Sequence, residues 1–228
     1  MSRVVIEETV RRHVTHIAYV AYLGWLALLG FGVSRFGSPG TGWPTFVTLL
    51  AIITGCGVIG PEFSSGTLQL ILVKPINRAT YLLSRVAGVV LVVWIGAVVA
   101  LIAEVIGRMT LGAVPWRALA GMFLNSAVAV VLAVSLLALL GSLTRAYLNV
   151  ALYIVLSIGL SMLPPVLAIA GAPASIARAV TLIEQNLYPT ATTGVYAQSL
   201  LMVLSNAAVA LVLACWFFRN REVPYGAD

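Results

Sequence analysis

The sequence predicts an all-α polytopic membrane protein with six transmembrane helices. Of its 228 residues, 61% are hydrophobic and only 9% are charged, which exceeds the apolar content of ordinary globular domains. The charged residues leave six gaps long enough for the stretch of about 20 apolar residues that crosses a bilayer. The apolar runs do not alternate with polar residues, as the strands of a membrane barrel would. We therefore expect spans at roughly 17–34, 43–60, 80–106, 118–141, 146–170 and 197–218 within one transmembrane domain, residues 1–228.

Residues 1–16 precede the first span and have the pattern of an interfacial helix. Two i,i+4 pairs of opposite charge, Glu7 with Arg11 and Glu8 with Arg12, would support the helix. We expect it to lie flat on the membrane surface. Its apolar stripe would consist of Ile6, Val10, Val14 and Ile17.

The same stretch contains "EETVRR", which fits the Glu-Glu-x-x-x-Arg pattern of membrane-embedded CAAX-type proteases. That chemistry also needs histidines on other transmembrane helices, to hold a metal or activate water. The only histidines are His13 and His16, which flank the motif itself. A surface helix held by ion pairs is therefore the better interpretation.

The thirteen basic residues predict the orientation. Six spans place both termini on one side, and the side richer in Lys and Arg faces the cytoplasm. The net charge of +6 then reflects topology and contact with anionic lipids, not nucleic-acid binding. The cytoplasmic set is Arg3, Arg11, Arg12, Lys74, Arg78, Arg85, Arg145, Arg219 and Arg221. The opposite set is Arg35, Arg108, Arg117 and Arg178.

The segment "GPEFSSGTLQLILVKPINR", residues 60–78, is the most polar part of the chain interior and reads as a broken helix at the cytoplasmic surface. Glu62 suits the positive end of a helix, and Gly66 permits a turn that bulky residues resist. Thr67 can cap a second short helix, and Asn77 can cap the third span. The segment is either a rigid protrusion on which a soluble partner can push or a simple linker.

Two features inside the predicted spans are candidate functional positions. Glu104 is costly in lipid, so we expect it to pair with Arg108 one turn later or to serve a substrate site, and the pair is favoured. Pro164 and Pro165 remove two backbone donors and should break or bend the fifth span.

Residues 172–190 resemble the N-terminal stretch in pattern and predict an interfacial helix on the extracytoplasmic side. Pro173 suits the first helical turn and Pro189 ends the element. The helix is either a lid packed on the bundle or part of a substrate exit. Its apolar face would consist of Ile176, Val180, Ile183 and Leu187.

The two cysteines predict neither a disulfide nor a metal site. Cys56 and Cys215 both fall inside predicted spans, where a thiol behaves as a small apolar side chain. Neither has a second ligand at metal-binding spacing.

Residues 60–88 resemble the signature region of type 2 ABC permeases, the membrane subunits of ATP-binding-cassette exporters. The matching pattern is Glu62, then Gly66-Thr67-Leu68, an apolar run, Pro75, Asn77-Arg78 and "YLLSRVAG". The resemblance implies that the segment 61–78 is a coupling helix which docks in a groove of an ATPase subunit. The residues that inherit this role are Glu62, Phe63, Ser64, Ser65, Gly66, Thr67 and Leu68.

The chain is not expected to hydrolyse ATP itself. Lys74 is its only lysine and no glycine stands in the "LQLILV" before it, so it has no phosphate-binding Gly-x-x-x-x-Gly-Lys loop. The resemblance therefore implies two separate ABC ATPase subunits, which would bind ATP and Mg, and a second permease subunit, identical or related. We expect no cofactor on this chain and a location in a bacterial or archaeal plasma membrane.

Two other classes compete with this interpretation. A stand-alone secondary carrier or channel would need intramembrane carboxylates or internal repeats, and the sequence offers only Glu104. A membrane-anchored enzyme would need a nucleophile and a base that can be placed together. Lipids, hydrophobic drugs, peptides and a role in maturing an exported enzyme all stay open as substrates.

Overall fold

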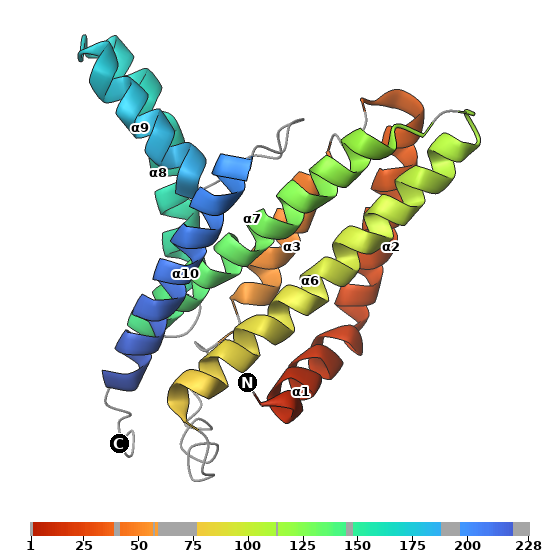
Figure 1. Ribbon diagram of the computed structural model, residues 1–228, viewed down its shortest axis with the longest axis horizontal. Coiled ribbons are helices and arrows are strands. Elements are labelled where there is room, and N and C mark those ends of the chain that lie inside the picture. Colours follow the sequence, from red (N-terminus) through yellow and green to blue (C-terminus); the bar gives the residue numbers. More distant parts are fainter. Residues whose placement is uncertain are drawn as a thin grey trace.

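The computed structural model describes residues 2–38, 42–56, 58, 77–112, 114–144, 148–187 and 197–220. Within these ranges the chain forms helices and no strand (Figure 1). Five helices, α2, α6, α7, α8 and α10, are long and apolar enough to cross a membrane, so the chain is an all-α, multi-pass membrane protein. The helices are α1 (Arg3–Val14), α2 (Ile17–Phe36), α3 (Trp43–Gly55), α6 (Arg78–Met109), α7 (Trp116–Leu143), α8 (Leu148–Ile169), α9 (Ala174–Leu187) and α10 (Ala197–Asn220).

Each of the six predicted spans corresponds to one of these helices. The second, α3, is apolar and is described over 13 residues, which is shorter than a full crossing. The count of six crossings therefore stays a prediction.

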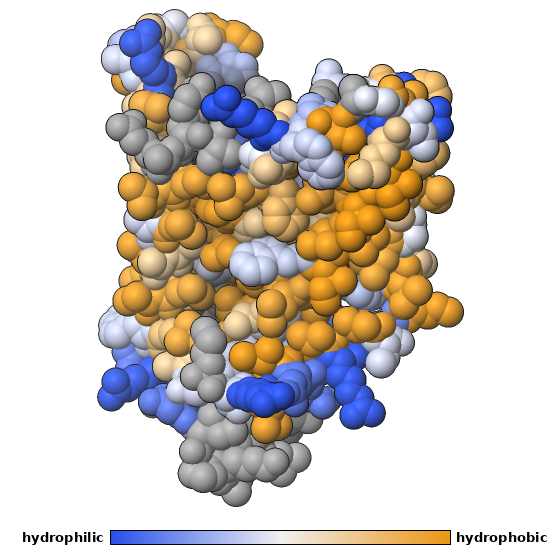
Figure 2. All heavy atoms as spheres, turned by 45° about the vertical axis from the view of Figure 1, so that its right-hand side comes forward, coloured by the Kyte–Doolittle hydropathy of each residue, from blue (hydrophilic) through white to orange (hydrophobic). Residues whose placement is uncertain are grey.

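The surface is divided as a bilayer requires. Figure 2 shows a broad apolar band with hydrophilic residues gathered above and below it. We call the end of the bundle that carries α1, Asn77 and Asn220 the proximal end, and the end that carries Phe36, Trp43 and Met109 the distal end (Figure 1).

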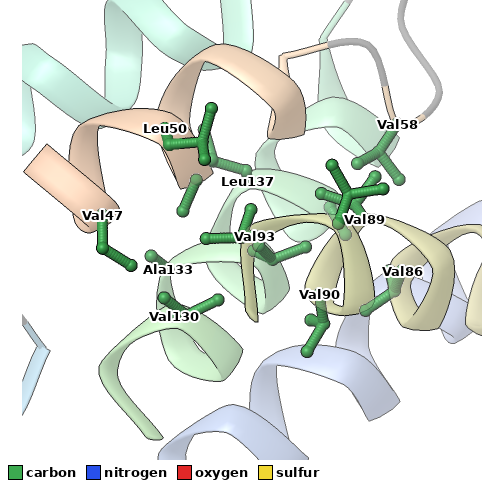
Figure 3. Close-up of a cluster of buried hydrophobic side chains, with 14 of the residues drawn as sticks. Val47, Leu50, Val58, Val86, Val89, Val90, Val93, Val130, Ala133 and Leu137 are labelled. Atoms are coloured by element: carbon green, nitrogen blue, oxygen red, sulfur yellow. The ribbon is translucent and has the colours of Figure 1, made fainter. Parts of the chain in front are cut away.

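The core lies between α3, α6 and α7 (Figure 3). Leu50 of α3, Val93 of α6 and Leu137 of α7 are almost completely buried in it. Because lipid tails are as apolar as these side chains, the helices are held by close packing rather than by exclusion of water.

Small residues allow α2 and α6 to approach closely. A side chain on Gly30 would overlap the Ala100 carbonyl, and one on Gly107 would overlap Ser34. A side chain on Gly96 would lie 2.8 Å from the Leu50 side chain and 3.1 Å from that of Leu26. Such contacts are how membrane helices gain packing energy without a hydrophobic driving force.

The predicted N-terminal helix is present as α1, but its contacts differ from those expected. It packs against α6 through Thr9, which is fully buried, whereas Ile17 of the predicted apolar stripe is 83% exposed. Glu7 accepts a hydrogen bond from Arg3 at 2.7 Å, so its partner lies one turn before it rather than at Arg11. Val10 of the predicted stripe does pack against the core, and the adjacent Thr9 extends the buried surface of α1 beyond that stripe.

The paired prolines do not break the fifth span. Pro164 and Pro165 both lie inside α8, which continues to Ile169. Each proline removes one backbone hydrogen bond, and its ring crowds the carbonyl four residues earlier, so a bend of α8 at this point stays a prediction. The pair stands near the end of α8, where few hydrogen bonds depend on it.

The predicted element 172–190 contains α9, which begins after Pro173 and lies beside α8 at the distal end (Figure 1). Ile176 and Ile183 are about half exposed, at 48% and 50%. Their exposure is compatible with a membrane-surface helix, and its extracytoplasmic placement stays a prediction.

Candidate functional site

The predicted coupling residues, 62–68, lie outside the described residues. The structure does describe the two ends to which their segment is attached. Both ends have specific contacts, which determine where the segment can act.

The downstream end is the start of α6. The Asn77 side chain accepts a hydrogen bond from the Ala79 backbone N–H at 3.1 Å, which confirms the predicted N-cap. Arg78 donates to the Arg219 carbonyl at 3.4 Å and so joins the start of α6 to the end of α10. Both contacts lie at the proximal end of the bundle.

The upstream end is the end of α3. Asn149, which is fully buried at the start of α8, directs its side-chain amide to the carbonyls of Cys56 at 3.5 Å and Leu137 at 3.4 Å. A side chain on Gly55 would lie 2.7 Å from Leu137, so α3 and α7 touch closely here. The described end of α3 therefore lies where α3, α7 and α8 meet.

A second polar cluster joins α1 to the first turns of α6. The Ser84 hydroxyl accepts from the Ser2 backbone N–H at 2.8 Å, and the largely buried Arg85 donates to the Thr9 hydroxyl at 3.1 Å. Gly88 completes the contact, because a Cβ there would lie 2.7 Å from the Thr9 Cβ. The sequence analysis did not predict this cluster. Thr9, a small neutral polar residue among charged ones, could have indicated a packed position on α1.

His13 belongs to the same cluster, one turn after Thr9. Its Nδ1 lies 2.8 Å from the Thr9 carbonyl oxygen. Burial lowers the pKa of His13, and the nearby positive charge of Arg85 lowers it further, while the hydrogen bond to Thr9 acts in the opposite direction. The neutral imidazole is therefore the form that the packed helix favours.

Glu104 forms a buried polar network at the distal end. Its carboxylate accepts from Arg108 Nε at 2.8 Å, which confirms the predicted pair. It also accepts from the indole N–H of Trp43 at 2.7 Å, and Arg108 donates to the Gly37 carbonyl at 3.2 Å. Glu104 and Trp43 are fully buried, and Arg108 is largely so.

Trp43 was missed as a partner of Glu104. The available signal was general: a buried indole N–H needs an acceptor, and Glu104 is a carboxylate within the apolar part of the chain. Pro164 and Pro165 do not join this network, because α8 packs against α7 and α9 while Glu104 faces α2 and α3.

The described polar side chains form contacts between helices. Among the described residues, no group of three or more His, Cys, Asp or Glu side chains could hold a metal ion. Cys56 and Cys215 are free thiols.

A family model described as "ABC-2 family transporter protein" matches residues 42–223. The match runs from the residue before α3 to beyond α10 and includes the whole segment between α3 and α6. A search of curated proteins found no match to the chain.

Proposed function

The chain belongs to the ABC-2 transporter family, and from this membership we propose that it is the permease of an exporter driven by separate ABC ATPase subunits. Members of this family generally work with such subunits in membranes. The complex would contain two ATPase subunits, which bind ATP and Mg, and a second permease chain, identical or related. The observation that carries the proposal is the family match across residues 42–223.

The orientation follows from the distribution of charge. Six arginines of the described chain belong to the proximal helix ends and only four to the distal ones, so the proximal end would face the cytoplasm. Both termini and the segment 61–78 would then be cytoplasmic, and six crossings would connect them. The proximal set is Arg3, Arg11, Arg12, Arg78, Arg85 and Arg219.

The contacts at the two ends of the segment support a role in coupling. A movement of the segment would displace the start of α6 at the Asn77 cap and the end of α3 at Cys56. The hydrogen bond from Asn149 to Cys56 would transmit the movement to α8, and the hydrogen bond from Arg78 to Arg219 would transmit it to α10. A passive linker would not need its ends attached to four different helices.

The test is the identity and activity of the native complex. The tagged chain, purified from native membranes in mild detergent, should bring with it a protein that contains a P-loop and a cassette signature. The complex in vesicles should hydrolyse ATP, while the chain alone should not. Full transport by the chain alone, driven by an ion gradient, would instead establish the secondary carrier.

A further inference from the structure

The Glu104 network connects three helices at one point. Trp43 is the first residue of α3, Gly37 directly follows α2, and Glu104 and Arg108 lie in the last turns of α6. A single carboxylate and its arginine therefore contact the distal ends of α2, α3 and α6. Because these groups are buried, removing one partner would leave a polar or charged group unsatisfied in an apolar surrounding.

Packing strengthens the same connection between α2 and α6. The Gly107 backbone lies against Ser34 and Phe31, and the Gly30 backbone lies against the Ala100 carbonyl. There is no room for a side chain at either glycine, so the two helices cannot slide past each other without separating.

The α8 helix is buried at its proximal end and exposed at its distal end. The fully or nearly buried residues of α8 are Asn149 and Tyr153, both in its first two turns at the proximal end. Ile169, its last residue, is 88% exposed. Figure 1 shows α8 and α9 leaning away from α7 toward the distal end.

We infer that Glu104, with Trp43 and Arg108, acts as a clamp that makes the distal halves of α2, α3 and α6 one rigid body. Opening at the distal end then takes place by movement of α8 and α9 relative to this body, and the clamp itself stays closed. The inference concerns the chain itself and does not depend on an ATPase partner.

Distances between spin labels test the inference on the full chain in lipid nanodiscs, with both native cysteines replaced. One pair, at Phe36 and Met109, spans the clamp from α2 to α6, and both positions are exposed. The second pair, at Met109 and Ile183, joins the clamp to α9. We expect a narrow distance distribution for the first pair and a broad one for the second.

Two variants open the clamp in different ways. Glu104→Gln removes the charge that faces Arg108, and Trp43→Phe removes the indole donor while keeping a ring. Each should broaden the Phe36–Met109 distribution. The matched controls are Glu7→Gln, an exposed carboxylate that also pairs with an arginine, and Trp25→Phe, a half-exposed indole on α2. Neither control should change the distribution.

The outcomes separate clearly. Broadening in the clamp variants alone supports the inference. A Phe36–Met109 distribution in the wild type as broad as that of Met109–Ile183, or unchanged widths in folded clamp variants, overturns it. If Glu104→Gln does not fold because Arg108 is left unpaired, the neutral double variant Glu104→Gln/Arg108→Gln and Trp43→Phe decide the matter by the same measurement.

Discussion

Thr9 of α1 packs directly against Gly88 of α6, so closely that a Cβ on Gly88 would lie 2.7 Å from the Thr9 Cβ. The contact joins an amphipathic helix outside the predicted spans to the first turns of the longest helix in the described chain. It also lies beside Arg85, which donates to the Thr9 hydroxyl. The position of α1 therefore depends on the absence of a side chain at residue 88.

Gly88→Val should displace α1. Overpacking of this kind costs about 1 to 3 kcal/mol. The melting temperature in detergent should fall, and trypsin should cleave faster after the exposed Arg11, because the backbone there is protected only while α1 is folded and packed. Gly24→Val is the control, because a Cβ at Gly24 meets nothing within 4 Å. Equal effects of the two substitutions would mean that the contact does not hold α1.

Acidification should weaken the folded state through His13. Its folded-state pKa lies below the ordinary value of 6.5, chiefly because of burial. Well above pH 6.5 the imidazole is neutral in both states and has no effect on stability. As the pH falls below 6.5, the unfolded chain binds the proton first, so the folded state loses stability until the lower folded pKa is passed.

The measurement is the melting temperature of wild type and His13→Gln between pH 8 and pH 5. The two curves should differ in slope below pH 6.5, with the wild type falling more steeply. The same slope in His13→Gln and wild type would exclude His13 as the source.

The coupling segment is tested by Gly66→Val and Glu62→Ala. If Gly66 makes a turn with positive φ, valine there would cost about 1 to 3 kcal/mol of local strain. Loss of the Glu62 carboxylate would remove a helix-end interaction of about 0.3 to 1 kcal/mol. We expect normal membrane expression, a sharp loss of ATPase co-purification in Gly66→Val and a measurable one in Glu62→Ala. Wild-type coupling in both variants would identify the segment as a linker.

Cysteine labelling tests the orientation in a background that lacks both native cysteines. Single cysteines at Ser38 and Ile183 should react with a membrane-impermeant reagent added to intact cells. Those at Arg3 and Asn220 should react only after the membrane is opened. The reverse pattern would place the proximal end outside and remove the proposed site for an ATPase.

The helices could be predicted because the spacing of charged residues limits where an apolar span can lie. The span expected at 80–106 is found as α6, Arg78–Met109, and it begins at the predicted cap Asn77. The helix extends beyond the predicted span at both ends, and these additional residues include Arg78 and Arg108. Both are charged, so the search for apolar stretches placed them outside the span. In the structure these arginines are accommodated by the Arg219 carbonyl and by Glu104.

The polar contacts could be predicted only where both partners lie within one helix. Glu104 and Arg108 are one turn apart, so their pairing follows from helical spacing. Trp43 is 61 positions away from Glu104, and no periodicity in the sequence relates the two. The face by which α1 packs depends on Gly88 in the same way, because the close approach is a property of the partner helix.

The clamp also has a consequence for the order in which the chain is built. The groups joined by its described hydrogen bonds, from Gly37 and Trp43 to Glu104 and Arg108, all precede residue 110. On the ribosome, α2 and α3 therefore already exist when the carboxylate of α6 enters the bilayer. The buried charge can be neutralised by Arg108, one turn later in the same helix, before α7 to α10 are inserted into the bilayer. The N-terminal half can thus assemble first and serve as the surface on which the later helices dock.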